Sequence, residues 1–518
     1  MKKYFYSLAT ALFCFFSLLP SQQLPKNFDA YVESVQKAFN VPGVAVAVVK
    51  DGKVVLAKGY GVQNITAKEK VNAETNFSIA SNSKAFTATA LGILVDEGKL
   101  QWNDRVIDYL PWFRLSDPYV TNELRITDLL VHRSGLGLGA GDLLIWPTNT
   151  YSYKEVVKRL RNVPLATSFR STYAYDNVLY LVAGEVIEAV SGMPWGEFIQ
   201  KKILDKLGMQ NTTVTYFDAV KKGNAATPHG EINTIVRPVA ASDSDKTNPA
   251  ASINSNAEDI AKWMICQLDS GKISGGERLF SATTSKNLWT LVTPIPVAPA
   301  RKELAPLKAN FAGYGLGFFM RDFRGKKLVW HTGGLSGMVS FVAMIPELRL
   351  GVAVFTNQEQ SGAFYSIGYR VLDAYLNENF DWLAGYKAMK ARSDSMTAAA
   401  EKKTASLRDS LSHPSLPLEK YAGMYRDAWY GDISITMKEG KLFMQMTATP
   451  SLGGFLEHYQ YDTFIARWSD PEMRADAFVT FSLKPDGSIE SAKMKAVSPA
   501  TDFSFDFHDL LLKPAGKQ

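Results

Sequence analysis

The sequence predicts an α/β protein in which an antiparallel sheet is flanked by helices and a helical subdomain, followed by a small antiparallel β-domain. Near the N-terminus, "VPGVAVAVVKDGKVVLAKGYG" places two apolar runs around an Asp-Gly pair, the strongest short-range signal for a β-hairpin. Three more strand-like runs lie between residues 326 and 357, and the chain before them is largely helical. After residue 416, apolar and polar residues alternate between glycine-containing turns, which indicates an antiparallel sheet or barrel.

Residues 1–22 have the layout of a secretory signal peptide. Two lysines precede an apolar core at residues 4–19, and a polar break follows it. No other stretch is long and apolar enough to span a bilayer, so we expect an exported chain, periplasmic or extracellular, with no membrane span after cleavage. Cleavage removes Cys14 and leaves Cys266 alone, which excludes an internal disulfide in the mature chain.

The first domain is expected to comprise residues 23–383. A lone hairpin cannot bury its apolar face, and "KKLVWH", "SFVAMIP" and "LGVAVFTN" supply three further strands late in this stretch. We therefore expect the sheet to join the two ends of the domain. Helical patterns at residues 153–161, at residues 177–191 and after Ser255 fill the region between.

A second domain is expected at residues 416–518, the small antiparallel β-domain. Residues 384–415, before it, are rich in Ala, Lys, Ser and Met, which predicts a helical linker ending before Pro414. A chain of 518 residues is longer than one compact domain usually needs, and this agrees with the division.

Composition excludes several classes of function. With 46% hydrophobic and 21% charged residues, the chain resembles an ordinary globular protein rather than a disordered one. The formal net charge is +6, but no run of Lys and Arg is interleaved with aromatic residues, so no nucleic-acid partner is expected. There is no glycine-rich phosphate loop between a strand and a helix, and we expect no cofactor. Five histidines are scattered without metal-ligand spacing, so no metal is expected: His132, His229, His413, His458 and His508.

A candidate nucleophile opens the apolar helix in "SIASNSKAFTATALGILVDEGKL". Ser81 and Lys84 are three residues apart, so on a helix they share one face and the amine can reach the hydroxyl group. If Lys84 is desolvated, its pKa falls and it can take the serine proton. Ser78 and Ser83 have no assigned chemistry and are expected to be helix caps or solvent-facing.

Two later stretches supply partners for this pair. "YAYDN" places Tyr175 and Asn177 on either side of an aspartate, where a loop leads into a helix. A second Tyr-x-Asn at residues 375–377 has the pattern of an ordinary amphipathic helix. "VWHTGGLSG" ends a predicted strand with glycines that let a substrate backbone come close, and its candidate residues are His331, Thr332, Gly333 and Gly334.

The order of these motifs, Ser-x-x-Lys, then Tyr-x-Asn, then His-Thr-Gly, resembles the penicillin-recognising serine hydrolases, especially their class C β-lactamase-like branch. "LLVHRSGL" at residues 129–136 and "GYGLGF" at residues 313–318 also resemble that branch, and His132 is expected to pack near the site. The resemblance covers roughly residues 28–383 and implies a β-lactamase-like fold for the first domain. The C-terminal region resembles the lipocalin-like β-domain often fused to these hydrolases, where it covers or narrows the active site or mediates self-association.

The resemblance also implies roles for single residues. Ser81 is the nucleophile that forms an acyl-enzyme, and Lys84 and Tyr175 share the proton transfers, with the main base left open. Asn177 hydrogen-bonds the substrate amide or positions Lys84. The backbone N–H groups of Ser81 and Gly334 hold the oxyanion. The remaining substrate-binding residues are His331, Thr332 and Gly333.

Position 331 departs from the lactamase pattern, where lysine is usual. A histidine with an ordinary pKa is mostly neutral at pH 7 and attracts a substrate carboxylate less well. This favours the esterase and D-aminopeptidase members over enzymes that act on β-lactams or free peptide C-termini. Residues 143–146, "LLIW", either line an acyl pocket or pack on the core, and the sequence leaves both open.

The expected function is that of an exported serine hydrolase acting on a small ester, amide or D-amino-acid-containing peptide. A β-lactamase or D,D-carboxypeptidase is one alternative, and a non-hydrolytic homologue that binds a ligand or partner is another. The partner is a small-molecule or peptide substrate, and a homo-oligomer remains open.

Overall fold

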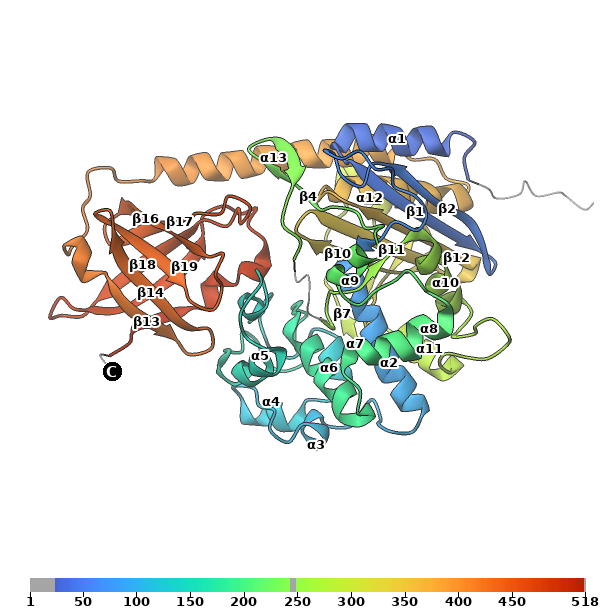
Figure 1. Cartoon of the computed structure of the whole chain (residues 1–518), viewed down its shortest axis with the longest axis horizontal. Helices are drawn as coiled ribbons and strands as arrows, with labels where there is room; N and C mark the ends of the chain where they lie inside the picture. Colours follow the sequence, from blue (N-terminus) through green and yellow to red (C-terminus); the bar gives the residue numbers. More distant parts are fainter. Residues whose placement is uncertain (1–23, 243–247, 517–518) are drawn as a thin grey trace, which may run out of the picture.

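The computed structural model describes residues 24–242 and 248–516. The predicted signal peptide lies outside the described residues. A large α/β body and a separate β-barrel are joined by one long helix, α13 (Trp382–Ser406), which starts on the body and runs toward the barrel (Figure 1). The predicted fold class, with an antiparallel sheet, flanking helices and a C-terminal antiparallel barrel, is confirmed.

The sheet of the body joins the two ends of its sequence, as predicted. Its eight strands run in the order β2-β1-β12-β11-β10-β9-β8-β7. The N-terminal hairpin pairs with the last strand of the body, with Val46 opposite Val354. The three late strand-like runs are β10, β11 and β12. The bounds are β1 (Gly43–Lys50), β2 (Lys53–Gly61), β7 (Thr293–Pro294), β8 (Ala312–Tyr314), β9 (Phe319–Phe323), β10 (Lys326–Leu335), β11 (Met338–Ile345) and β12 (Leu350–Thr356).

Both faces of the central strands are buried because helices cover each side. Alternate residues of a strand point to opposite faces, and in β1 Val44, Val46 and Val48 join one apolar cluster while Ala45 and Ala47 join another. The first cluster lies under α1 (Phe28–Phe39) and α12 (Ser361–Tyr375), and the second under α10 (Ala257–Leu268). Helix α2 (Ser83–Asp96), which carries the candidate nucleophile at its start, also belongs to the second side.

The helical subdomain lies between β2 and β7 in the sequence, below the sheet in Figure 1. Its remaining helices are α3 (Val106–Tyr109), α4 (Pro118–Glu123), α5 (Tyr153–Arg159), α6 (Val178–Ser191), α7 (Trp195–Ile199), α8 (Asp205–Leu207), α9 (Tyr216–Lys221) and α11 (Ala282–Leu288). Two small two-stranded sheets pair β3 (Phe77–Ser78) with β6 (Asn254–Ser255) and β4 (His229–Ile232) with β5 (Ile235–Pro238). Among the described residues, no single helix is long and apolar enough to cross a membrane; α6 with residues 195–207 passes that test only as a pair bent by 72°.

The C-terminal domain is a closed barrel of eight antiparallel strands, in which the last strand pairs with the first. Closure leaves no free sheet edge. Aromatic side chains such as Tyr421, Phe464 and Phe481 pack edge to face inside it. The strands are β13 (Gly423–Asp427), β14 (Gly431–Lys438), β15 (Lys441–Met446), β16 (Gly453–Gln460), β17 (Thr463–Trp468), β18 (Ala477–Leu483), β19 (Ile489–Ala496) and β20 (Leu511–Pro514).

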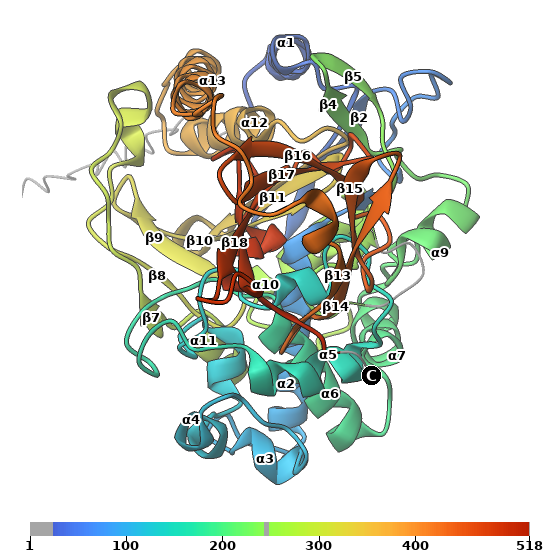
Figure 2. The ribbon, with the colours of Figure 1, turned by 90° about the vertical axis from the view of Figure 1, so that its left-hand side faces the viewer.

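The barrel packs against the helical subdomain rather than hanging from α13 alone, and Figure 2 shows it in front of the body. Tyr151 donates to the Tyr430 carbonyl over 3.0 Å, and the Thr150 N–H donates to the Ala448 carbonyl over 2.9 Å. The apolar interior of the barrel is continuous with the core of the helical side. The barrel is therefore positioned to present loops to the body.

Candidate active site

Ser81 lies where a short strand turns into the buried helix α2. Strand β3 leads into a single 3-10 turn, η1 (Ala80–Asn82), and α2 begins at Ser83. Ala80 has φ 48°, a left-handed conformation that costs a residue with a side chain roughly 1–2 kcal/mol. Strain of this kind is found at functional sites, and this turn holds Ser81 partly exposed at the start of a helix whose next twelve residues are buried.

The other two serines of the stretch support the backbone. Ser78 donates to Asn254 Oδ1 over 2.6 Å, and Ser83 accepts from the Ile253 N–H over 3.0 Å. Both serines are buried. The expectation that they are helix caps or solvent-facing is therefore wrong, because a second segment of chain covers this end of α2.

Lys84 is fully buried and in contact with the hydroxyl group of Ser81. Its Nζ donates to Ser81 Oγ over 3.1 Å, to Asn177 Oδ1 over 2.6 Å and to the Ala250 carbonyl over 3.1 Å. An ammonium group has three N–H donors, and these three acceptors satisfy all of them.

Burial changes the protonation of this amine. Desolvation lowers the pKa of Lys84 to about 7, while the carboxyl groups of Asp142 and Asp176 act in the opposite direction. Near neutral pH a large fraction of the amine is unprotonated. In that form two N–H groups still donate to the amide and carbonyl acceptors, and the nitrogen lone pair can accept the Ser81 proton.

Tyr175 lies on the other side of the same serine. Its hydroxyl is hydrogen-bonded to Ser81, and its ring centroid is 4.8 Å from Lys84 Nζ. Burial raises the pKa of Tyr175 well above its usual range. The phenol therefore keeps its proton at neutral pH and is suited to donate one, whereas Lys84 is suited to accept one.

The segment that carries Tyr175 is held by the "HRSGL" stretch. The His132 carbonyl accepts from the Ala174 N–H over 2.9 Å, and His132 Nδ1 accepts from the Asp176 N–H over 3.2 Å. The rings of His132 and Tyr175 lie 4.3 Å apart, and His132 is buried. The position agrees with the packing role near the site that was expected for His132.

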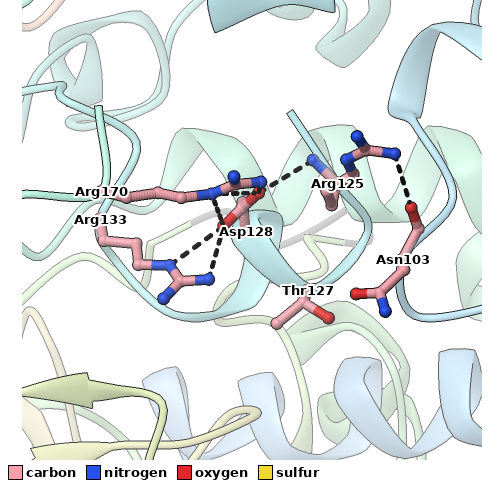
Figure 3. A pocket seen from close by; sticks show the side chains of 6 residues that line it. All are labelled: Asn103, Arg125, Thr127, Asp128, Arg133 and Arg170. Atoms are coloured by element: carbon pink, nitrogen blue, oxygen red, sulfur yellow. Dashed lines mark hydrogen bonds and ion pairs between the residues drawn. The ribbon is translucent and has the colours of Figure 1, made fainter. Parts of the chain in front are cut away.

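An arginine cluster fixes the same segment from its far side (Figure 3). The buried carboxylate of Asp128 accepts from Arg133 Nε over 3.0 Å and from Arg170 Nε over 3.1 Å. The backbone N–H of Arg125 also donates to it over 3.0 Å. These contacts join the stretch before His132 to the loop before Tyr175, so the cluster supports the site without touching Ser81.

Asn177 connects Lys84 to a buried carboxyl group. While its Oδ1 accepts from Lys84, its Nδ2 donates to Asp142 Oδ2 over 2.7 Å. Asp142 is fully buried at the start of η3 (Asp142–Leu144), and burial raises its pKa to about 7. The second Tyr-x-Asn, at the end of α12, has a buried tyrosine in the other core cluster, as its amphipathic pattern predicted.

Strand β10 lies directly against the Ser81 turn. A Cβ atom on Gly333 would come within 2.1 Å of the Ile79 carbonyl oxygen, so only glycine fits there. The next residue, Gly334, is exposed beside this contact. Thr332, which points to the opposite face of the strand, is hydrogen-bonded to Tyr365 of α12, so its hydroxyl is not presented to a substrate beside Ser81.

His331 faces the site but is buried, with 2% of its surface exposed. Tyr314 donates to His331 Nε2 over 2.7 Å, and Nδ1 contacts the Thr332 carbonyl over 2.5 Å. Burial and the nearby Lys84 lower the pKa of His331 to about 3. Both ring nitrogens are engaged and the ring is neutral, so His331 supports Tyr314 and offers a substrate no free nitrogen and no positive charge. Tyr314 lies in "GYGLGF" and was not among the predicted site residues.

The apolar residues after Asp142 pack on the core. Leu143 and Leu144 are fully buried, and Ile145 is 8% exposed. Of the two alternatives left by the sequence, the core is therefore the one that the structure supports, and the acyl-pocket interpretation is wrong for these leucines.

The barrel contributes a segment to the site. Within η9 (Phe503–Phe505), Phe503 packs edge to face with Tyr175 at 6.0 Å, and Ser504 donates to Asp142 Oδ2 over 2.9 Å. The Gly141 N–H donates to Asp506 Oδ2 over 2.7 Å. These contacts support the expectation that the barrel covers or narrows the site. Sequence analysis missed Asp142 and Ser504, because no local pattern connects residues this far apart.

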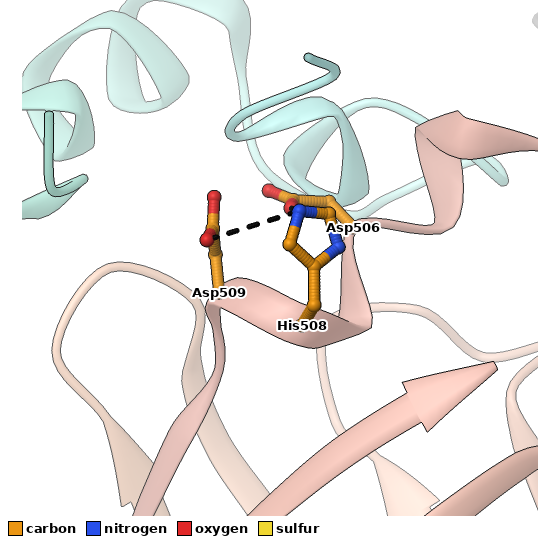
Figure 4. A group of neighbouring side chains, drawn as sticks. All are labelled: Asp506, His508 and Asp509. Atoms are coloured by element: carbon orange, nitrogen blue, oxygen red, sulfur yellow. Dashed lines mark ion pairs between the residues drawn. The ribbon is translucent and has the colours of Figure 1, made fainter. Parts of the chain in front are cut away.

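A group of potential metal ligands lies beside this segment (Figure 4). Donor atoms of Asp506, His508 and Asp509 lie within 4.8 Å of one another, a grouping that the spacing of the histidines alone did not predict. The side chain of His508 is 58% exposed, and the buried Asp506 already accepts from Gly141. We therefore assign the group to the contact between barrel and body.

The comparisons with known proteins agree with this geometry. Residues 28–376 match the family model described as Beta-lactamase, and residues 407–514 match a domain of unknown function, DUF3471. The chain is 29% identical to unguisins hydrolase ungD of Aspergillus violaceofuscus, covering 90% of this chain and 87% of that protein. It is 26% identical to protein flp of Staphylococcus aureus, covering 64% and 63%.

Solved structures show the same fold at lower identity. The octameric penicillin-binding protein homologue from Pyrococcus abyssi superposes with a TM-score of 0.60 at 21% identity, covering 94% of this chain and 99% of that one. The structure of SurE with D-Leu gives a TM-score of 0.52 at 19% identity, covering 94% and 98%.

Proposed function

Because the chain belongs to the Beta-lactamase family, a family of serine hydrolases, we propose that it hydrolyses a small ester, amide or D-amino-acid-containing peptide through an acyl-enzyme on Ser81. The hydrolase name of the fungal relative, which matches almost the whole chain, supports hydrolysis as the activity.

One observation carries the proposal: a fully buried lysine with a pKa near 7 lies 3.1 Å from Ser81 Oγ. A serine hydroxyl attacks a carbonyl carbon only when a base takes its proton. Lys84 is the better candidate for that base, because Tyr175 is protonated at neutral pH. The C–O bond between Ser81 Oγ and the carbonyl carbon forms as the proton passes to Lys84 Nζ.

The remaining roles follow from position. Tyr175 donates its proton to the leaving group and recovers one from Lys84. Asn177 holds Lys84 by its carbonyl oxygen. The N–H groups of Ser81 and the exposed Gly334 stabilise the oxyanion, because β10 brings Gly334 beside the Ser81 turn.

Substrate class depends on position 331. The buried, neutral His331 supplies no charge for a substrate carboxylate, which disfavours β-lactams and free peptide C-termini. The unguisins hydrolase name and the D-Leu bound to a protein of the same fold support the inclusion of peptides with D-residues.

The test is the initial rate of p-nitrophenyl acetate hydrolysis by the wild type and by Ser81→Ala, with mass spectrometry of a fluorophosphonate-treated sample. We expect turnover and a Ser81 adduct in the wild type and neither in the variant. Turnover that survives in Ser81→Ala would overturn Ser81 as the nucleophile. A wild type that neither turns over nor becomes labelled would favour the non-hydrolytic binder.

Substrate class is tested separately. Cleavage of D-alanyl p-nitroanilide would favour a peptidase, and turnover limited to esters would favour an esterase. Rapid nitrocefin hydrolysis would contradict the argument from His331 and favour the β-lactamase alternative.

We also propose export through residues 1–22, supported by the two lysines and the apolar core, and tested by fractionation with and without that segment. Self-association is proposed on the octamer formed by the archaeal protein of the same fold. Light scattering of the purified mature chain tests it, and a monomer at all concentrations would overturn it.

A further inference from the structure

We infer that Ser504, delivered by the C-terminal barrel, is a positioning residue for the Asn177–Lys84 pair, so that the barrel completes the active site of the hydrolase body. The inference rests on the proposed function of Ser81 and Lys84 and adds to it a residue from the other domain.

A continuous chain of hydrogen bonds links Ser504 to the nucleophile. Ser504 donates to Asp142 Oδ2 over 2.9 Å, and Asn177 Nδ2 donates to the same oxygen over 2.7 Å. Asn177 Oδ1 then accepts from Lys84 Nζ over 2.6 Å, and Nζ reaches Ser81 Oγ over 3.1 Å.

The direction of each bond shows why Asp142 matters. Lys84 needs the carbonyl oxygen of the Asn177 amide, so the NH₂ group must point away from it. An ionised carboxylate can only accept hydrogen bonds, and Asp142 therefore fixes that orientation. If Asp142 became protonated, it could donate to the carbonyl oxygen and allow the amide to turn its NH₂ group toward Lys84.

The Ser504 hydroxyl opposes that protonation. Burial raises the pKa of Asp142, and the hydrogen bonds from Asn177 and Ser504 act against this rise. Asp142 is fully buried and Ser504 is 9% exposed, so water can replace the hydroxyl only poorly. The charged and titratable groups around Lys84 and Asp142 are Asp176, Tyr175, Tyr180, His132, His331, Asp506 and Asp509.

Neighbouring contacts hold Ser504 in place. Its own N–H donates to Asp502 Oδ1 over 2.9 Å, while Asp506 accepts from the Gly141 N–H on the body. Phe503 packs over Gly139, where a Cβ atom would meet the Phe503 ring at 2.8 Å. The segment is therefore fitted to the loop that carries Asp142.

The test compares Ser504→Ala, Ser504→Thr and a matched control in the full-length protein. The control is Ser415→Ala, which removes a serine-to-aspartate hydrogen bond of 2.8 Å inside the barrel, away from the body. Each variant is assayed for p-nitrophenyl acetate turnover between pH 5.5 and 9, beside the wild type and Ser81→Ala, and for melting temperature.

We expect Ser504→Ala to lower kcat by about tenfold with little change in KM, the effect of one hydrogen bond to a charged group. Its Asp142 is more protonated and raises the pKa of Lys84 less, so the rise of activity with pH should shift to lower pH. Ser504→Thr should recover most of the rate, because its hydroxyl can make the same bond. Ser415→Ala should keep the wild-type rate and profile.

Two results would overturn the inference. One is a Ser504→Ala profile that matches the wild type in kcat and pH dependence. The other is a loss of rate that follows only a lowered melting temperature and is shared by Ser415→Ala. If the wild type has no Ser81-dependent turnover, the proposed function fails; the Lys84 ¹³Cε resonance, assigned with Lys84→Arg, then decides the inference, which falls if its titration is the same in Ser504→Ala.

Discussion

The Ser-x-x-Lys spacing occurs twice in the chain, and the two copies lie in opposite environments. Ser34 and Lys37 are on α1, both exposed, and the Ser34 hydroxyl donates to the Tyr31 carbonyl over 2.7 Å. Ser81 and Lys84 stand at the start of α2, where the amine is fully buried and contacts the serine hydroxyl. The spacing brings a serine and a lysine to one helix face in both cases, but only burial makes the second lysine able to accept a proton.

The largest expected effect distinguishes the two lysines. Lys84→Ala should lower kcat/KM for p-nitrophenyl acetate by about 10²–10⁴-fold, the usual contribution of a general base, whereas Lys37→Ala should leave it unchanged. Lys84→Arg should fail as well, because a guanidinium group does not give up its proton. Equal rates for Lys84→Ala and Lys37→Ala would remove the distinction between the copies.

A second prediction concerns the strand that lies against the Ser81 copy. Gly333→Ala should destabilise the fold by about 1–3 kcal/mol, since its methyl group would overlap the Ile79 carbonyl oxygen. Gly334→Ala is the control, because its nearest neighbour would be 3.9 Å away and its stability should change by less than about 0.5 kcal/mol. Urea unfolding curves measure both, and equal midpoints would mean that β10 does not hold the Ser81 turn.

The pH dependence sharpens the comparison further. Only unprotonated Lys84 can act as the base, and the amine loses its proton as pH rises through about 7. We therefore expect kcat/KM for a neutral ester to rise by about tenfold per pH unit below 7 and to level off above it. Asp142 and Asp176, whose pKa values are also raised to about 7, ionise over the same range and should broaden the rise. A flat profile, or one that falls with pH, would contradict Lys84 as the base.

The smallest expected effect is on the exposed serine. Ser34→Ala removes one exposed hydrogen bond, so stability should change by less than about 0.5 kcal/mol and labelling of Ser81 by a fluorophosphonate should be unaffected. Labelling of Ser34 in the wild type would show that exposure and spacing suffice, against the conclusion drawn from burial.

The parts that sequence predicted are those with a local pattern. The Asp-Gly hairpin and the three late strands carry period-two apolar runs, and pairing of β1 with β12 followed from the need to bury both. The three motifs of the site, read in order, predicted that Ser81, Lys84, Tyr175 and Asn177 would meet, and the structure places them together.

The parts that sequence did not predict depend on packing. The inward or outward direction of Thr332 is set by strand register and by Tyr365 on a distant helix. His331 was expected to contact substrate, but its partner Tyr314 lies on another strand, and burial rather than residue type decides its charge. Asp142 and Ser504 are separated by 362 positions and meet only when two domains pack together.

The contact between Ser504 and Asp142 sets an order of events in synthesis. The other residues of the site, from Ser81 to Gly334, leave the ribosome well before residue 504, so a nascent hydrolase body can fold while this hydrogen bond is still missing. The bond forms only after the barrel strands up to β19 have been made and the barrel has closed against the helices. Maturation of the catalytic centre is therefore one of the last steps in making this protein.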